Sequence, residues 1–143
     1  MGIEVASLKA RVKASGLFGQ VQDVLSLADA MRNPGSFLKT AFVVLPKETA
    51  EPGRRDGGPK TQRVSTRICV AFTLAAQRAA GERSDEVEAL RSTIKRHMMG
   101  WQPTGAETAL DYAYSDISQT VPGFIWVNLF FDCKYIETEE AVT

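Results

Sequence analysis

The chain has 143 residues, of which 44% are hydrophobic and 24% charged, a composition typical of a globular domain. Seventeen basic side chains balance seventeen acidic ones, so bulk attraction to nucleic acid or to an anionic membrane is excluded as the basis of function. No apolar run approaches the roughly 18 residues of a membrane span, and the first residues lack the apolar core of a signal peptide. We expect one domain over residues 1–143 and no membrane partner.

Two short helices and a strand are predicted in the first third of the chain. Residues 3–15 carry apolar side chains at helical spacing and end near Gly16, which can adopt the left-handed conformation that closes a helix. Residues 17–21 suit a short strand. Residues 23–31 repeat the helical spacing and stop before the Asn33-Pro34-Gly35 breaker.

A long hairpin is predicted next. The stretch from Phe37 to Pro46 is apolar on both alternating faces, which predicts a strand covered on both sides and ended by Pro46. Residues 47–60 contain three glycines, two prolines and seven charged side chains, so we expect a long flexible loop. Residues 61–76 alternate again between apolar and polar positions. The loop is therefore the tip of an elongated hairpin and not a linker between domains.

One long helix follows the hairpin. Ser84 is a good N-terminal cap, acidic residues occupy the first turn and basic residues the last, and Gly100 can end the helix. The apolar stripe expected to face the core consists of Val87, Leu90, Ile94 and Met98. Trp101 follows just outside the helix.

The C-terminal part predicts a second hairpin. A strand over residues 108–119 is joined by residues 121–123 to the last strand, 124–135, which has an apolar side chain at every odd position from 125 onwards. Residues 137–143 are polar and are expected to fray. The elements together predict an α+β fold, with a single antiparallel or mixed sheet of about four to five strands and two to three helices packed on it.

The sequence offers little chemistry. The single histidine, His97, lies in the last turn of a helix, where its charge complements the helix end. The two cysteines, Cys69 and Cys133, lie in predicted strands and suit buried positions in a reducing compartment. One histidine and two distant cysteines cannot assemble a zinc site, and no phosphate-binding or hydrolase motif occurs. We predict no catalytic residue, no metal, no cofactor and no enzymatic activity.

Two groups of side chains are candidates for binding a partner. The first is basic and lies in the long loop and at the start of the next strand, where it could contact an acidic or phosphate surface or simply be a solvated turn. Its members are Arg54, Arg55, Lys60 and Arg63, with Arg67 further along the strand. The second comprises Trp126 and Phe130 on the outer face of the last strand. They are either covered by the helices or exposed at a subunit interface.

The order of these pieces resembles the tail terminator proteins of long-tailed bacteriophages, particularly the Mu-like group. The two best markers are Gly100-Trp101-Gln102-Pro103 after the long helix and the aromatic final strand around Trp126. The other matching segments are Leu8 to Arg11, Leu17-Phe18, Val44-Leu45-Pro46, Gln62-Arg63-Val64, Val87 to Arg91, and Pro122 to Phe130. Asn128-Leu129 departs from the acidic or Gln-Asp residues that are common there.

The resemblance implies a structural protein of the virion, located at the neck end of the tail and assembled in the host cytoplasm. Six copies would close into a ring that caps the last ring of the tail tube, stops tube polymerisation and offers a surface to the head-side connector. The implied partners are further copies of the chain, the major tail tube protein, the head-tail connector protein and the DNA that passes through the ring. Arg54 and Arg55 are candidate contacts for that DNA or for the tube.

Two other functions stay open at the level of the sequence. The protein could be a different head-tail connector or tail completion factor, with another neighbour in the virion. It could also be a small α+β enzyme or ligand-binding domain whose site is built from dispersed residues, and a pocket beneath Trp101 would favour that function.

Overall fold

A computed structural model of the chain describes residues 2–53, 57–75, 80–119 and 121–139, with backbone alone at 80–84. In chain order the elements are α1 (Val5–Lys13), β1 (Gln20–Gln22), α2 (Val24–Arg32), the 3₁₀ helix η1 (Pro34–Phe37), β2 (Thr40–Ala50), β3 (Thr61–Ala75), α3 (Ala80–Met98), β4 (Asp111–Ser118) and β5 (Phe124–Thr138). The strands form one sheet in the order β1-β2-β3-β5-β4. Among the strands of the described residues, β1 and β2 are parallel neighbours and the other three pairs are antiparallel, so the predicted α+β fold with a mixed sheet is confirmed.

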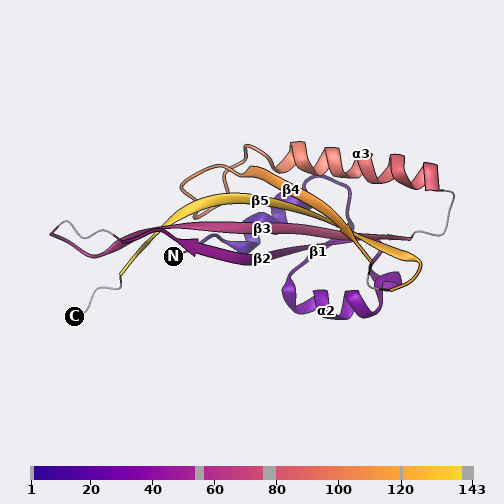
Figure 1. The fold of residues 1–143 in the computed structure, drawn as a ribbon, viewed down its shortest axis with the longest axis horizontal. Helices are drawn as coiled ribbons and strands as arrows, with labels where there is room; N and C mark the ends of the chain where they lie inside the picture. The colour runs from indigo at the N-terminus through magenta and orange to yellow at the C-terminus, as the bar shows by residue number, and fades with distance from the viewer. Residues whose placement is uncertain (1, 54–56, 76–79, 120, 140–143) are drawn as a thin grey trace.

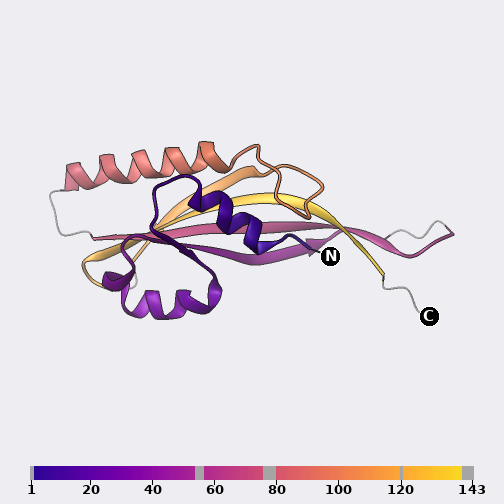
Figure 2. The same cartoon turned by 180° about the vertical axis from the view of Figure 1, so that it is seen from behind.

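One side of the sheet, the core face, packs against α1 and α3. Figures 1 and 2 show α3 along this side of the sheet and α1 lying across the strands. Leu8 and Val12 of α1 and Ile94 and Met98 of α3 are completely buried there. They meet the odd-numbered side chains of β5, which are buried from Val127 to Tyr135. The period-two pattern of the last strand therefore predicted its core face correctly.

The other side of the sheet, the open face, is covered by a helix at one end only. There α2 buries Ala30 in a small cluster with Phe42, Cys69 and Trp126. Helix α2 lies on the opposite side of the sheet from α3 (Figure 1). Because β2 lies between the two layers, its residues 40–43 are buried on both faces, as the sequence predicted.

Strand β2 does not end at Pro46, and the prediction that it does is wrong. The strand continues to Ala50, so only the part of the predicted 47–60 loop that follows Ala50 lies outside the strand. Between Val44 and Lys47, β2 has one residue more than β3 opposite it, which is a β-bulge. A bulge interrupts the ladder of hydrogen bonds, so the missing N–H of proline is tolerated there.

The boundaries of four other elements also differ from the sequence predictions. Helix α3 begins at Ala80, so Ser84 lies inside the helix and is not its cap. Strand β4 is shorter than the predicted 108–119, and β1 begins later than the predicted 17–21. Strand β5 continues past residue 135 to Thr138, which pairs with Thr61 of β3. The predicted fraying at 137 is therefore wrong for residues 137 and 138, because β3 offers them a partner.

The end of α3 is joined to α1 by a compact set of contacts. Gly100 has a φ of +86° and ends the helix as predicted, and its N–H donates to the carbonyl of Leu110 at 2.8 Å. The Arg11 guanidinium donates to the His97 carbonyl at 2.8 and 3.1 Å and lies 5.4 Å from the centre of the Trp101 ring. The His97 ring nitrogen Nε2 lies 2.6 Å from the Arg11 carbonyl oxygen. His97 thus has a structural role in holding the two helices together.

Candidate interaction surface

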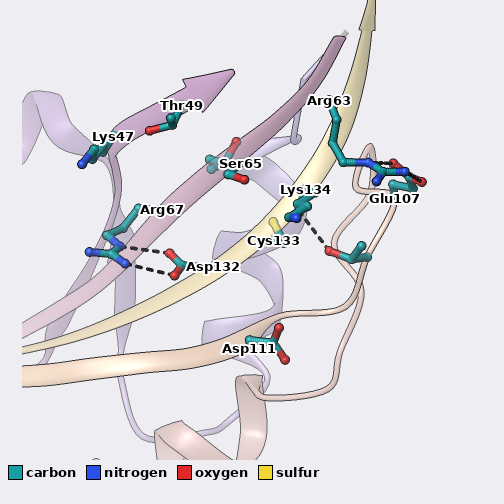
Figure 3. A pocket seen from close by; sticks show the side chains of 12 residues that line it. Lys47, Thr49, Arg63, Ser65, Arg67, Glu107, Asp111, Asp132, Cys133 and Lys134 are labelled. Atoms are coloured by element: carbon teal, nitrogen blue, oxygen red, sulfur yellow. Dashed lines mark hydrogen bonds and ion pairs between the residues drawn. The ribbon is translucent and has the colours of Figure 1, made fainter. Parts of the chain in front are cut away.

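The part of the open face that α2 leaves uncovered is a polar hollow formed by β2, β3 and β5 (Figure 3). Its volume is about 550 Å³. Its polar lining follows from strand alternation: Ser65 and Arg67 face the hollow because their neighbours Thr66 and Ile68 face the core. Other lining side chains are Lys47, Thr49, Arg63, Asp132 and Lys134.

An ion pair between Arg67 and Asp132 lies in the middle of the hollow. The two residues are direct partners across β3 and β5, and the guanidinium donates to both carboxylate oxygens at 2.9 and 3.0 Å. The hydrogen bond to Asp132 raises the pKa of Arg67. Both side chains are partly exposed, so the pair contributes only about 0–1 kcal/mol to folding. Its main effect is to fix the direction of both side chains.

Two further ion pairs involve residues of the same two strands, Arg63 of β3 and Lys134 of β5. Arg63 donates to both oxygens of Glu107 at 2.9 and 3.3 Å, and Lys134 lies 3.5 Å from Glu51. Each of these cations is already balanced by a carboxylate. A phosphate group would have to displace Glu107 before Arg63 could bind it.

The predicted basic group is therefore only partly described by the structure. Arg54 and Arg55 lie outside the described residues. Lys60 is exposed, and its backbone N–H donates to the carboxylate of Glu139 at 2.7 Å. Arg63 is engaged with Glu107, so the structure does not bring Lys60 and Arg63 together as a pair of uncompensated cations.

The two predicted aromatic residues lie in different environments. Trp126 is 1% exposed and packs beneath α2, with its ring centre 5.8 Å from that of Phe42. Phe130 is half-buried and stacks on Tyr114 of β4, with ring centres 4.5 Å apart and planes inclined by 19°. Tyr114 is 43% exposed. Of the two predicted aromatic residues, Trp126 is buried within the subunit and Phe130 is partly exposed.

Sequence reasoning missed the acidic partners in this hollow. Asp132, Glu107 and Glu51 lie far along the chain from their basic partners, so no spacing in the sequence links them. An opposite charge facing Arg67 across a strand pair is a usable signal only when the register of β3 on β5 is known. A long helix and another strand separate β3 from β5, so no turn fixes that register in the sequence.

The described groups whose pKa shift is largest are two thiols and a tyrosine. Burial raises the pKa of the Cys69 thiol to about 12 and that of Cys133 to about 11, so both are protonated at neutral pH. Burial, followed by a hydrogen bond to Glu48, raises the pKa of Tyr135 to about 12. Within the described ranges, no cluster of His, Cys, Asp and Glu could hold a metal ion, and no helix is long and apolar enough to cross a membrane.

Comparison with known proteins identifies the family. The family model described as phage tail terminator protein matches residues 3–141, which include all nine elements of the fold. A search of individually curated proteins found no match. The family is a structural one, which places the protein in the phage tail and argues against an enzymatic role. The chain belongs to the phage tail terminator family.

Proposed function

We propose that this protein forms a ring that caps the tail tube, stops tube polymerisation and provides the docking surface for the head-side connector. The observation that carries the proposal is the family match over residues 3–141. A six-membered ring is the arrangement that the resemblance to Mu-like terminators implies. In such a ring the DNA would pass through the central opening.

The shape of the fold supports this proposal. The paired ends of β3 and β5 (residues 61–63 and 136–138), together with the end of β2, form an arm that extends beyond the helices (Figure 1). Ile136 in this arm is 48% exposed, although it is apolar. We propose that the arm contacts the last ring of the tail tube, because burial of such a side chain against a partner is favourable.

The basic residues between β2 and β3 in the sequence have a proposed role in the same contact. Arg54, Arg55 and Lys60 belong to the connection between β2 and β3, which leaves and re-enters the arm. In a ring, this connection could reach either the tube or the lumen, where arginine side chains would meet DNA phosphates. Arg63 would act there only after release from Glu107.

Tube length is the property that tests the proposal. Phage lacking this protein should assemble tails of variable and increased length without heads, because tube polymerisation then has no stop. Resupply of the wild-type protein should restore uniform tails and infectivity. A chain with Arg54→Glu and Arg55→Glu should restore a lower phage titre than the wild type. Normal tube lengths in the absence of the protein would contradict the terminator role, and unchanged titre of the double variant would contradict the role of the arginines.

The same experiment separates the proposal from its main alternative. A head-tail connector or completion factor would leave tube length unchanged and would block only the joining of heads to finished tails. Uniform, headless tails in the absence of the protein would therefore favour that alternative.

A further inference from the structure

The C-terminal ends of α1 and α3 lie side by side on the helical side of the sheet (Figure 2). Hydrogen bonds from the Arg11 guanidinium and the His97 ring to each other's backbone carbonyls hold the two ends together. Five basic side chains gather at this place, and we call them the helix-end patch. They are Lys9, Arg11 and Lys13 of α1 and Lys95 and Arg96 in the last turn of α3.

The helix-end patch has no carboxylate partners within the described part of the chain. Helix α1 contains no acidic residue, and the described acidic side chains of α3, at positions 85, 86 and 88, lie towards the other end of that helix. On the open face, in contrast, Arg63, Arg67 and Lys134 are each paired with a carboxylate. Since the chain has no net charge, the helix-end patch is a local excess of positive charge.

Contacts within the subunit explain only part of this charge. Basic residues in the last turn of a helix stabilise its negative end. Arg11 and Lys95 also lie over aromatic rings, at 5.4 and 4.8 Å from the ring centres. Among the residues that the structure describes, no comparable side-chain contact holds Lys9, Lys13 or Arg96. These three cations are therefore available to a partner.

The three available cations are also accessible. Lys13 and Arg96 are exposed, and Lys9 and Lys13 line a groove of about 310 Å³ between α1 and β1. The two lysines are four residues apart on one helix, so their side chains are neighbours. An anionic group in this groove would contact both ammonium groups.

The surroundings of the patch favour a nucleic acid over a protein as the partner. Ala6 and Ala10 are exposed on the outer side of α1, opposite its buried residues, and small side chains let a backbone approach closely. The most exposed large apolar side chains, Val24 and Leu25, belong to α2, on the other side of the sheet. A protein interface normally has an apolar or aromatic centre, whereas binding to a nucleic-acid backbone depends mainly on lysine and arginine.

We propose that the helix-end patch binds the phosphate backbone of duplex DNA. The proposal rests on the proposed function, because the chain would meet DNA in the central opening of the ring, and α1 and α3 would then face that opening. Contacts between cations and phosphates carry no information about base sequence. They are weak individually and let a protein slide along DNA, which suits a ring through which DNA has to pass.

Removal of the three available charges tests the proposal. A variant with Lys9→Gln, Lys13→Gln and Arg96→Gln leaves the contacts of Arg11 and Lys95 in place, so we expect it to fold normally. Binding to a fluorescent duplex of about 20 base pairs is measured by anisotropy between about 50 and 200 mM salt. We expect about tenfold weaker binding than for the wild type, and a decrease of about 0.9 in the slope of log K against log salt for each lost contact.

The matched control removes the same number of charges from elsewhere. It carries Arg32→Gln on α2 and Lys47→Gln and Lys134→Gln on the open face, so its net charge equals that of the patch variant. We expect the control to bind the duplex like the wild type. Equal losses of affinity in the two variants would mean that net charge alone attracts DNA, and would overturn the proposal. So would a wild-type protein that does not bind the duplex at about 50 mM salt.

Photo-crosslinking locates the DNA independently of charge. A photoreactive amino acid placed at Ala10, beside Lys9 and Lys13, should form a covalent adduct with the duplex on irradiation. The control position is Ala28, an exposed alanine of α2 on the other side of the sheet, and it should give no adduct. Adducts at Ala28 and none at Ala10 would contradict the proposal.

The formation of rings or caps separates this inference from the proposed function. The patch variant should cap purified tail tubes as well as the wild type does, because its substitutions alter only the contact with DNA. A patch variant that binds the duplex normally but no longer caps tubes would overturn the inference, and would identify the patch as a contact for an acidic protein surface. Wild-type protein that forms no ring and leaves tube ends growing would overturn the proposed function itself, whatever its affinity for DNA.

Discussion

Replacing Trp126 by alanine is expected to lower the free energy of unfolding by about 3–5 kcal/mol. The side chain is 1% exposed and fills the space between the sheet and α2, in contact with Phe42. Alanine would leave a cavity that β5, held between β3 and β4, cannot close by moving. Urea denaturation of the purified protein, followed by circular dichroism, measures the loss.

The matched control is Trp126→Phe. The indole Nε1 is buried without a hydrogen-bond partner in the part of the chain that the structure describes. Phenylalanine therefore removes volume and an unpaired donor together, and we expect a loss of about 1–2 kcal/mol. If the free energy of unfolding of the alanine variant were within about 1 kcal/mol of the wild-type value, α2 would not cover Trp126 in solution. The residue would then be available at a subunit interface after all.

Replacing Gly105 by alanine is expected to cost about 2–4 kcal/mol of unfolding free energy. The residue has a φ of +91°, which disfavours any side chain, and a Cβ atom there would collide with the carbonyl oxygen of Gly2. The collision involves backbone, and the N-terminal segment cannot easily move because the Glu4 N–H donates to the Thr104 carbonyl at 3.0 Å. Denaturant unfolding reports the cost, and faster proteolysis near the N-terminus would report the displacement.

Gly16→Ala provides the control for backbone conformation alone. Gly16 has a similar φ of +75°, but a Cβ atom there would meet nothing within 4 Å. Its replacement should cost only about 1–2 kcal/mol. Equal losses for the two variants would mean that the N-terminal segment does not pack on Gly105 as described.

The sequence was most informative where the apolar side chains of a long strand alternate regularly. Alternation from 125 to 135 and across β3 predicted which side chains face the core, because a shift of one residue would expose all of them. The spacing of Ile94 and Met98 likewise predicted the buried side of α3. Because these patterns of apolar residues depend only on which side is buried, the core could be predicted without any knowledge of the topology.

Features that depend on contacts between distant residues could not be predicted in this way. Pro46 is a strong strand terminator in isolation, and only the bulge against β3 lets β2 continue through it. The ion pairs of the hollow required the register of β3 on β5. Helix α2 has apolar residues at helical spacing, yet Val24 and Met31 are exposed because the helix rests on the sheet through Leu27 and Ala30.

The candidate partner residues were predictable only in part. Phe130 was chosen because aromatic side chains exceed what one face of a strand normally needs, and it lies half-buried against Tyr114. Trp126, chosen for the same reason, belongs to the core of the subunit. The family was indicated by the order of motifs around Trp101 and Trp126, and the match over residues 3–141 confirms it.

The ring is the central claim, and imaging tests it most directly. Native mass measurement and negative-stain electron microscopy of the purified protein should be carried out with and without purified tail tubes of the same phage. We expect closed rings, either in solution or as a discrete cap at one end of each tube, and no further growth of capped tubes. A protein that stays monomeric and leaves tube ends bare and growing would contradict the claim.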